Sequence, residues 1–267
     1  MEVSVDVITT KSWEEFESHL SSFFREPIRQ RVTPPRLTTP LFRGHGDASW
    51  SLKTTLERSA GHQFTMSEYF KKIRDVKPAV ISLTGKEWVL PEGFDPGYGP
   101  PAPPPGYEFM IYLRHHGFPS PLLDWSRSPY VAAYFAFHRG DVHDNEHVAI
   151  YSYARCTMYK KLRSVKAGDI IRLGQNVVSH RRHYLQQSEY TICIKPSENE
   201  NSAFAYARHE DLEASSSDGF HKFTKYRIPR SERKKVMNRL MLMNITAFSL
   251  FGSEESLMET LAYTQIK

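Results

Sequence analysis

Three short stretches of the sequence hold residue types whose combination and spacing could do chemistry. Residues 41–44 (LFRG) place Arg43 between an apolar pair and a glycine. An arginine at the end of a strand can hold a phosphate or a carboxylate through its two-pronged guanidinium group. Residues 124–129 (DWSRSP) supply an acid, a flat ring and two hydroxyls, and residues 187–189 (QSE) supply two polar acceptors on one face of an extended segment. Together they suggest a binding or catalytic site for a polar ligand.

Each stretch also has a purely structural explanation. Arg43 would serve equally in a surface ion pair, and residues 187–189 would serve as an edge strand with a polar outer face. Ser128 followed by Pro129 is typical of a helix start, with serine at the N-cap and proline at the first helical position. This explanation is strong for Ser128 and weaker for Asp124 and Ser126.

Composition limits the function classes. The chain has 267 residues, 40% hydrophobic, with a net charge of +5, so a basic surface permits an anionic partner without requiring one. The nucleotide-binding loops GxxxxGK and GxGxxG are absent, as are the HExxH and GxSxG motifs. Two cysteines form neither a disulfide framework nor a zinc pattern.

A metal site is disfavoured. The paired His115 and His116 would point to opposite faces of a strand, and His143 and His147 lie in a polar loop. No apolar run is long enough to span a bilayer and no signal peptide precedes the first strand, so the sequence predicts a cytoplasmic protein without membrane contact.

The elements that must position these residues follow from periodicity. Alternating valines within residues 1–10 predict a strand, and Ser12 with Glu15 forms a capping box for a helix that ends before Pro27. Further strands are predicted at 148–153, 190–194 and 223–228, short strands or turns at 169–173 and 175–178, and helices at 67–76, 129–137, 230–243 and 253–263. The irregular alternation predicts an α+β fold with mixed sheets and flanking helices.

The sequence is expected to form a single domain over residues 1–267. Residues 1–40 are interpreted as an N-terminal strand and helix extension. Residues 91–106 (PEGFDPGYGPPAPPPG) form a Pro/Gly-rich insertion, which is either an exposed loop or a lid over a cleft.

Four segments in order resemble the FRG domain family, named for its Phe-Arg-Gly motif, here residues 42–44. They are LFRG, LRHHGFPSPLLDWSRSPYVAAYFAF, HYLQQSEYTIC and LFGSEESLMETLA, which span from about Leu41 to the C-terminus. Residues 115–137 match the central signature of the family closely. Pro121 departs from it, because a basic residue is expected there, and a ligand contact made by that residue in relatives would be missing here.

The order of these motifs is similar to that of the Arg–Ser–Glu class of mono-ADP-ribosyltransferases. This resemblance implies an ADP-ribosyltransferase-like split β-sandwich with NAD as substrate. The implied catalytic residues are Arg43, Ser126 and Glu189: Arg43 would clamp the pyrophosphate, Ser126 would order the site, and Glu189 would stabilise the oxocarbenium-like state. The implied NAD-binding set adds Trp125 or Tyr130 stacked on nicotinamide, Gln187 facing the acceptor, and His115 and Ser128.

The expected function is therefore an ADP-ribosyltransferase-like enzyme, a mono-ADP-ribosyltransferase or an NAD glycohydrolase. It would cleave NAD and transfer ADP-ribose to a protein or nucleic-acid acceptor. The family's association with bacterial mobile elements suggests a toxin or phage-defence effector with an antitoxin or defence-system partner. The alternative is a non-catalytic module that binds a nucleotide or nucleic acid. A glycosidase or nuclease using Asp124 and Glu189 as paired acids ranks last.

Overall fold

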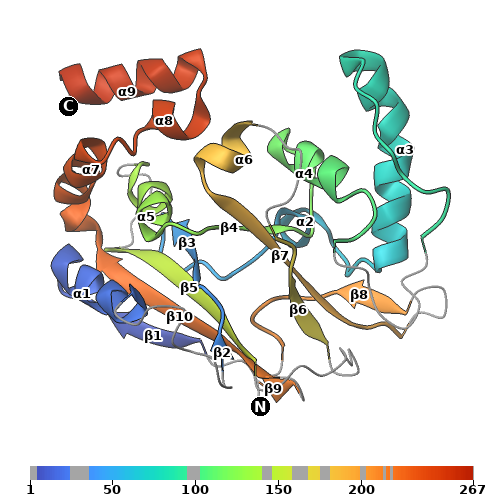
Figure 1. The fold of residues 1–267 in the computed structure, drawn as a ribbon, viewed down its shortest axis with the longest axis horizontal. Helices are drawn as coiled ribbons and strands as arrows, with labels where there is room; N and C mark the ends of the chain where they lie inside the picture. Colours follow the sequence, from blue (N-terminus) through green and yellow to red (C-terminus); the bar gives the residue numbers. More distant parts are fainter. Residues whose placement is uncertain are drawn as a thin grey trace.

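The described strands join in one mixed sheet (Figure 1). A computed structural model describes residues 5–24, 36–94, 103–139, 146–157, 168–174, 181–198, 203–212, 215–216 and 219–266. Along the main path, the strand order is β1 (Asp6–Thr9), β10 (Gly219–Pro229), β5 (His147–Thr157), β3 (Leu41–His45), β4 (Leu123–Ser126), β7 (Ser188–Pro196) and β6 (Asp169–Arg172). Three short strands lie outside this order: β2 (Arg36–Leu37) pairs with β5, β8 (Phe204–Tyr206) with β7, and β9 (Ser215–Ser216) with β10.

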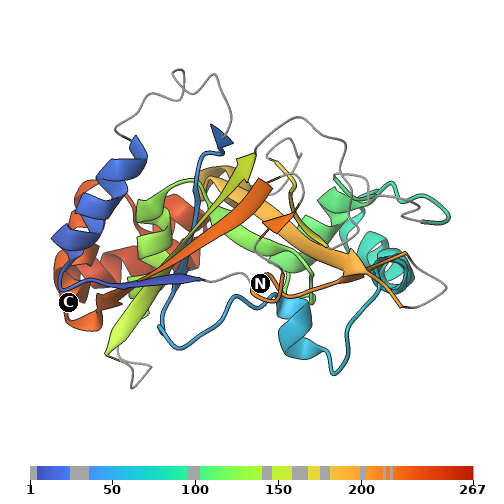
Figure 2. The same ribbon diagram turned by 90° about the horizontal axis from the view of Figure 1, so that it is seen from below.

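The sheet is mixed because β1 runs parallel to β10, whereas the other named strand pairs are antiparallel. Helices flank it, and in Figure 2 the strands are seen to twist strongly from one end of the molecule to the other. The predicted mixed fold with flanking helices is thus confirmed at this level. The finer arrangement expected from the transferase resemblance stays a prediction.

The helices gather around two halves of the sheet (Figure 1). Around β10, β5 and β3 lie α1 (Trp13–Phe24), α5 (Pro129–Phe137), α7 (Arg233–Leu242), α8 (Ala247–Phe251) and α9 (Glu254–Ile266). Around β4, β7 and β6 lie α2 (Thr55–Ser59), α3 (Met66–Thr84), α4 (Tyr107–His115) and α6 (Arg181–Leu185).

The two halves meet at a weak seam. Strands β3 and β4 share one register pair, Phe42 with Ser126. In contrast, β3 pairs with β5 from Leu41 to His45, and β4 pairs with β7 from Leu123 to Ser126. The strands on either side of the seam therefore diverge.

Helix α5 packs closely on β3. Seven of its nine residues are buried, so the helix is apolar on all sides and belongs inside the core. A Cβ atom at Gly44 would lie 1.9 Å from the backbone oxygen of Ala132. The glycine of the LFRG motif thus lets the helix backbone approach the strand.

Several local predictions are confirmed in whole or in part. At the start of α1 the amide of Glu15 donates to Ser12 Oγ (3.3 Å), which confirms Ser12 as the N-cap. The Glu15 carboxylate accepts from the amide of Lys11 (2.7 Å) and not from that of Ser12, so the predicted capping box is formed only in part. The helix predicted at 67–76 is longer and continues through Pro78 to Thr84. It begins at a capping box formed by Thr65 and Glu68, which the sequence analysis did not identify.

Other predictions fail or go untested. His115 and His116 end helix α4 instead of lying on a strand, because a helix buries four of the apolar residues between 109 and 113 in one core cluster. The strand or turn predicted at 175–178, His143 and the middle of the Pro/Gly-rich stretch lie outside the described residues. None of the described helices has the length and apolarity to cross a bilayer.

Candidate functional site

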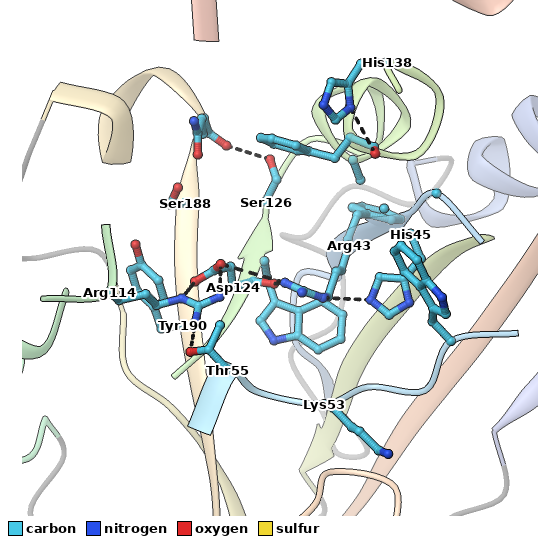
Figure 3. A pocket seen from close by; sticks show the side chains of 18 of the residues that line it. Arg43, His45, Lys53, Thr55, Arg114, Asp124, Ser126, His138, Ser188 and Tyr190 are labelled. Atoms are coloured by element: carbon cyan, nitrogen blue, oxygen red, sulfur yellow. Dashed lines mark hydrogen bonds and ion pairs between the residues drawn. The ribbon is translucent and has the colours of Figure 1, made fainter. Parts of the chain in front are cut away.

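A cavity of about 920 Å³ opens where β3 and β4 diverge (Figure 3). Its walls come from β3, β4 and β7, from α2, α4, α5, α6 and α8, and from the loop after β3. The seam described above therefore positions the site, because it leaves space between two neighbouring strands.

Arg43 spans the seam. Its Nη1 donates to the backbone oxygen of Asp124 (2.8 Å), and its Nε donates to His45 Nε2 (3.0 Å). The guanidinium group thus supplies β4 with a donor next to the point where backbone pairing with β3 stops. Burial lowers the pKa of Arg43 to about 10, so the side chain is still charged at neutral pH.

His45 is the neutral partner in this arrangement. Burial and the neighbouring charge of Arg43 lower the pKa of His45 well below its ordinary value. The unprotonated Nε2 can then accept the hydrogen bond from Arg43. His45 therefore helps to fix the direction in which Arg43 points.

Asp124 lies between two arginines (Figure 3). Arg114 on α4 donates to both oxygens of the Asp124 carboxylate, and its Nη1 donates to Thr55 Oγ1 (2.8 Å). Arg43 Nη1 lies 3.9 Å from Asp124 Oδ2. Burial on its own would raise the pKa of Asp124, but the two arginines hold this pKa below its ordinary value. One carboxylate thus faces two guanidinium groups, which leaves a local excess of positive charge.

The excess extends around the cavity. Within the described part of the chain, Asp124 is the one carboxylate on the wall, against these cationic side chains: Arg43, Lys53, Arg58, Arg114, Arg139 and Arg182. Aromatic residues line other parts of the wall: Phe42, Trp50, Trp125, Phe135, Tyr190 and Phe251. This combination suits an anionic ligand that also carries a flat or apolar part.

Four of the predicted site residues line this cavity: Arg43, His115, Trp125 and Ser126. Ser126 is already engaged, because its hydroxyl donates to the backbone oxygen of Gln186 (2.8 Å) and accepts from the amide of Ser128 (3.1 Å). It ties the end of β4 to the turn after α6. His115 Nε2 lies 3.2 Å from the Tyr190 hydroxyl.

Trp125 offers little of its ring to a ligand. Its side chain belongs to a buried core cluster, and its Nε1 donates to Thr191 Oγ1 (2.8 Å). Ser128 has the structural role considered above, since its Oγ accepts from the amide of Val131 at the start of α5. Tyr130 packs against Trp13 with ring centroids 6.3 Å apart and, like Ser128, is not among the cavity-lining residues.

Glu189 points to the other face of β7. Ser188 and Tyr190 line the cavity, and side chains alternate along a strand, so Glu189 between them faces away. Its carboxylate is 2% exposed and forms a two-pronged ion pair with Arg172. Gln187 adopts a left-handed turn conformation (φ 49°) and does not line the cavity either. The roles expected for these two residues receive no support from this geometry and stay predictions.

Sequence reasoning missed most of the cationic wall. Arg114 stands directly before His115 in the family signature, so a helical interpretation of that segment would have drawn attention to it. Arg182 is one of the arginines that favour the nucleic-acid-binding alternative, but nothing local places it or Phe251 at the cavity, because only long-range packing brings α6 and α8 there. The described residues include no cluster of three or more histidine, cysteine or acidic side chains that could hold a metal ion.

Comparison with known proteins identifies one family. Residues 38–145 match the model of the FRG domain. This range carries Arg43, Arg114, Asp124 and Ser126, so the segment similar to the FRG domain supplies the polar residues on the seam side of the cavity. No curated protein and no solved structure matches the chain.

Proposed function

We propose that the cavity binds a nucleotide through its phosphate groups. The observation that carries this proposal is the pair of arginines, Arg43 and Arg114, fixed on either side of Asp124 with a net positive charge. Guanidinium groups form strong charge-assisted hydrogen bonds with phosphate oxygens, and both groups are held in place by partners before a ligand arrives. The volume of about 920 Å³ lies within the range of small-molecule and cofactor sites.

The rest of the wall supports a ligand with a base. Phe135 and Phe251 form an edge-to-face pair with ring centroids 6.0 Å apart on the α5 and α8 side. Gln186 lines the same cavity, and its side-chain amide donates to the backbone oxygen of Leu250. A base would lie on the aromatic side, with its phosphates toward Arg43 and Arg114.

Thermal unfolding with a ligand panel tests this proposal. NAD, ADP-ribose and ADP should raise the Tm, whereas adenosine and nicotinamide should not, because they lack phosphate. Arg43→Gln should abolish the shift, and Arg208→Gln is the matched control because Arg208 is 57% exposed and does not line the cavity. Equal shifts with adenosine and ADP would overturn the proposal.

A second candidate function is cleavage of NAD by an ADP-ribosyltransferase-like enzyme. It is favoured by the placement of Arg43 and Ser126 on neighbouring strands of one cavity, in the order of that class. The division of the sheet at the β3–β4 seam also supports a transferase-like fold. Hydrolysis would break the bond between nicotinamide and the ribose C1′, with water adding to C1′ and one proton released.

In that reaction we propose Asp124 as the ligand-facing carboxylate, because it lines the cavity and its side chain is 41% exposed. Nicotinamide release should be measured for the native protein, Asp124→Asn and Glu189→Gln, with folding checked by circular dichroism. Loss in Asp124→Asn with retention in Glu189→Gln supports this assignment. No release by the native protein, alone or with lysate, DNA or RNA, rejects NAD cleavage and leaves the binding proposal intact.

A further inference from the structure

A group of exposed cationic and aromatic side chains lies beside the cavity at the turn after α6. We call it the α6 rim and define it as Arg127, Arg181 and Tyr184. Arg127 and Arg181 are exposed, and the Tyr184 side chain is 84% exposed. A tyrosine this exposed contributes little to the core, and its ring is open to contact with a ligand.

Backbone hydrogen bonds bring the segments of the rim together. The amide of Arg127 donates to the backbone oxygen of Gln187 (3.1 Å), and the amide of Gln187 donates to the backbone oxygen of Tyr184 (3.0 Å). Arg181 belongs to the same short helix as Tyr184. Helix α6 lies at the end of β7 near β4 and α4, as seen in Figure 1.

The rim carries uncompensated positive charge. Within the described residues, neither Arg127 nor Arg181 forms an ion pair with a carboxylate. Arg182, the next residue along α6, lines the cavity, with its guanidinium carbon 5.5 Å from the centroid of Phe251. Glu255 at the start of α9 is close enough to Arg182 for the two charges to interact. The excess of positive charge is therefore strongest on the side of α6 that faces away from the cavity.

The rim and the cavity share a wall. Arg182 and Gln186 lie on the cavity side of the segment that carries Arg181 and Tyr184 on its outside. The Ser126 hydroxyl fixes this segment to β4 through the backbone oxygen of Gln186 (2.8 Å). A ligand that leaves the cavity past Arg182 would thus meet more arginines and an exposed aromatic ring.

We propose that the α6 rim binds a single-stranded nucleic acid and leads one of its nucleotides into the cavity. Arginines that follow a phosphate backbone, together with an aromatic ring on which a base can stack, are the usual means of binding single strands. An acidic peptide would match the charge but would not use the exposed ring. The entry of a nucleotide into the cavity rests on the proposed nucleotide site, whereas binding of the strand at the rim does not.

Fluorescence anisotropy with a labelled 12-nucleotide single strand, as DNA and as RNA, tests the proposal. The variant Arg127→Gln/Arg181→Gln/Tyr184→Ala should bind at least about 10-fold more weakly, because it loses two phosphate contacts and one stacked base. Native binding should weaken steeply with salt, and the variant should show a smaller salt dependence. Its Tm shift with ADP should be unchanged, because none of the three residues lines the cavity.

A control with the same loss of charge is Lys71→Gln/Lys72→Gln on α3, which lies well away from α6 in Figure 1. It should bind the strand like the native protein. The proposal is overturned if the rim variant and this control bind equally, or if polyglutamate competes as well as the oligonucleotide. If single strands bind through the rim but ADP fails to shift the Tm, then the nucleotide proposal falls and the rim proposal stands.

Discussion

At the scale of single residues, the ion pair between Glu189 and Arg172 allows a structural role of this carboxylate to be tested against a catalytic one. Glu189 is buried, and Arg172, itself partly exposed, also donates to the backbone oxygen of Thr39 (2.8 Å). Removing one member of a buried pair leaves the other charge without its partner. Glu189→Gln should therefore lower the free energy of unfolding by about 2 kcal/mol, less than for a fully enclosed pair.

Urea unfolding measures this effect. The double variant Glu189→Gln/Arg172→Met should recover at least half of the lost stability, because it no longer contains an unpaired charge. ADP binding by the folded protein should be unchanged in both variants. If stability is unaltered while nicotinamide release disappears, Glu189 acts in catalysis after all.

His209 links the stability of the protein to pH. The Thr191 hydroxyl accepts from Trp125 Nε1, so its own hydrogen is free to donate to His209 Nε2 (2.8 Å). Burial, with the charges of Arg43 and His221, lowers the pKa of His209 to about 3. The unfolded chain therefore takes up the proton first as the pH falls. The stability associated with neutral His209 is complete above about pH 6.5 and is lost progressively toward pH 3.

His209→Gln tests this dependence, since the glutamine oxygen can accept the same hydrogen bond. The difference in free energy of unfolding between the native protein and the variant should change by about 2 kcal/mol between pH 7.5 and pH 5. The change should favour the variant at the lower pH. Comparing the variants at each pH cancels the similar contribution of His45, whose pKa is also lowered. If the difference in free energy of unfolding does not change with pH, the assignment of this pH dependence to His209 is wrong.

At the scale of elements, the contact between α5 and β3 fixes the geometry of the seam. Gly44→Ala would force the helix away from the strand, because the added Cβ meets backbone atoms of Ala132 and Ala136 at 1.9 and 2.7 Å. We expect a loss of about 3 kcal/mol in urea unfolding, at the upper end for overpacking. Gly61→Ala is the control: its Cβ would meet nothing within 4 Å, so the stability should change by less than about 1 kcal/mol.

Helix starts that have local signals could be predicted from the sequence. The face of β7 that lines the cavity could not. Ser12 with Glu15 and Ser128 with Pro129 mark helix starts within a few residues, and the structure confirms both. The face of β7 depends on where the strand begins. Gln187 takes a left-handed turn, so β7 starts at Ser188, and Ser188 rather than Glu189 faces the cavity. A shift of one residue reverses every side chain of a strand, and no local pattern determines it.

At the scale of the whole molecule, the cavity brings together residues that are far apart in the chain. Arg43, Arg114, Arg182 and Phe251 lie on four elements from both halves of the sheet. Arg43 and Ser126, which motif order pairs, both line this cavity, but motif order could not reveal its cationic wall. A nucleotide bound as proposed would therefore bridge two halves that share one backbone register pair at the seam.

A ligand that contacts both β3 and β4 should produce a specific pattern of hydrogen exchange. Backbone amides in β3 and β4 near the seam should exchange through local opening, and a ligand that holds both strands should suppress it. At an ADP concentration of about 100 times the Kd, exchange at residues 41–45 and 123–126 should slow by up to about 100-fold. Helix α3 lies outside the cavity wall and should exchange as before. Arg114→Gln should remove the protection on both strands together. Protection of only one strand would show that the ligand does not span the seam.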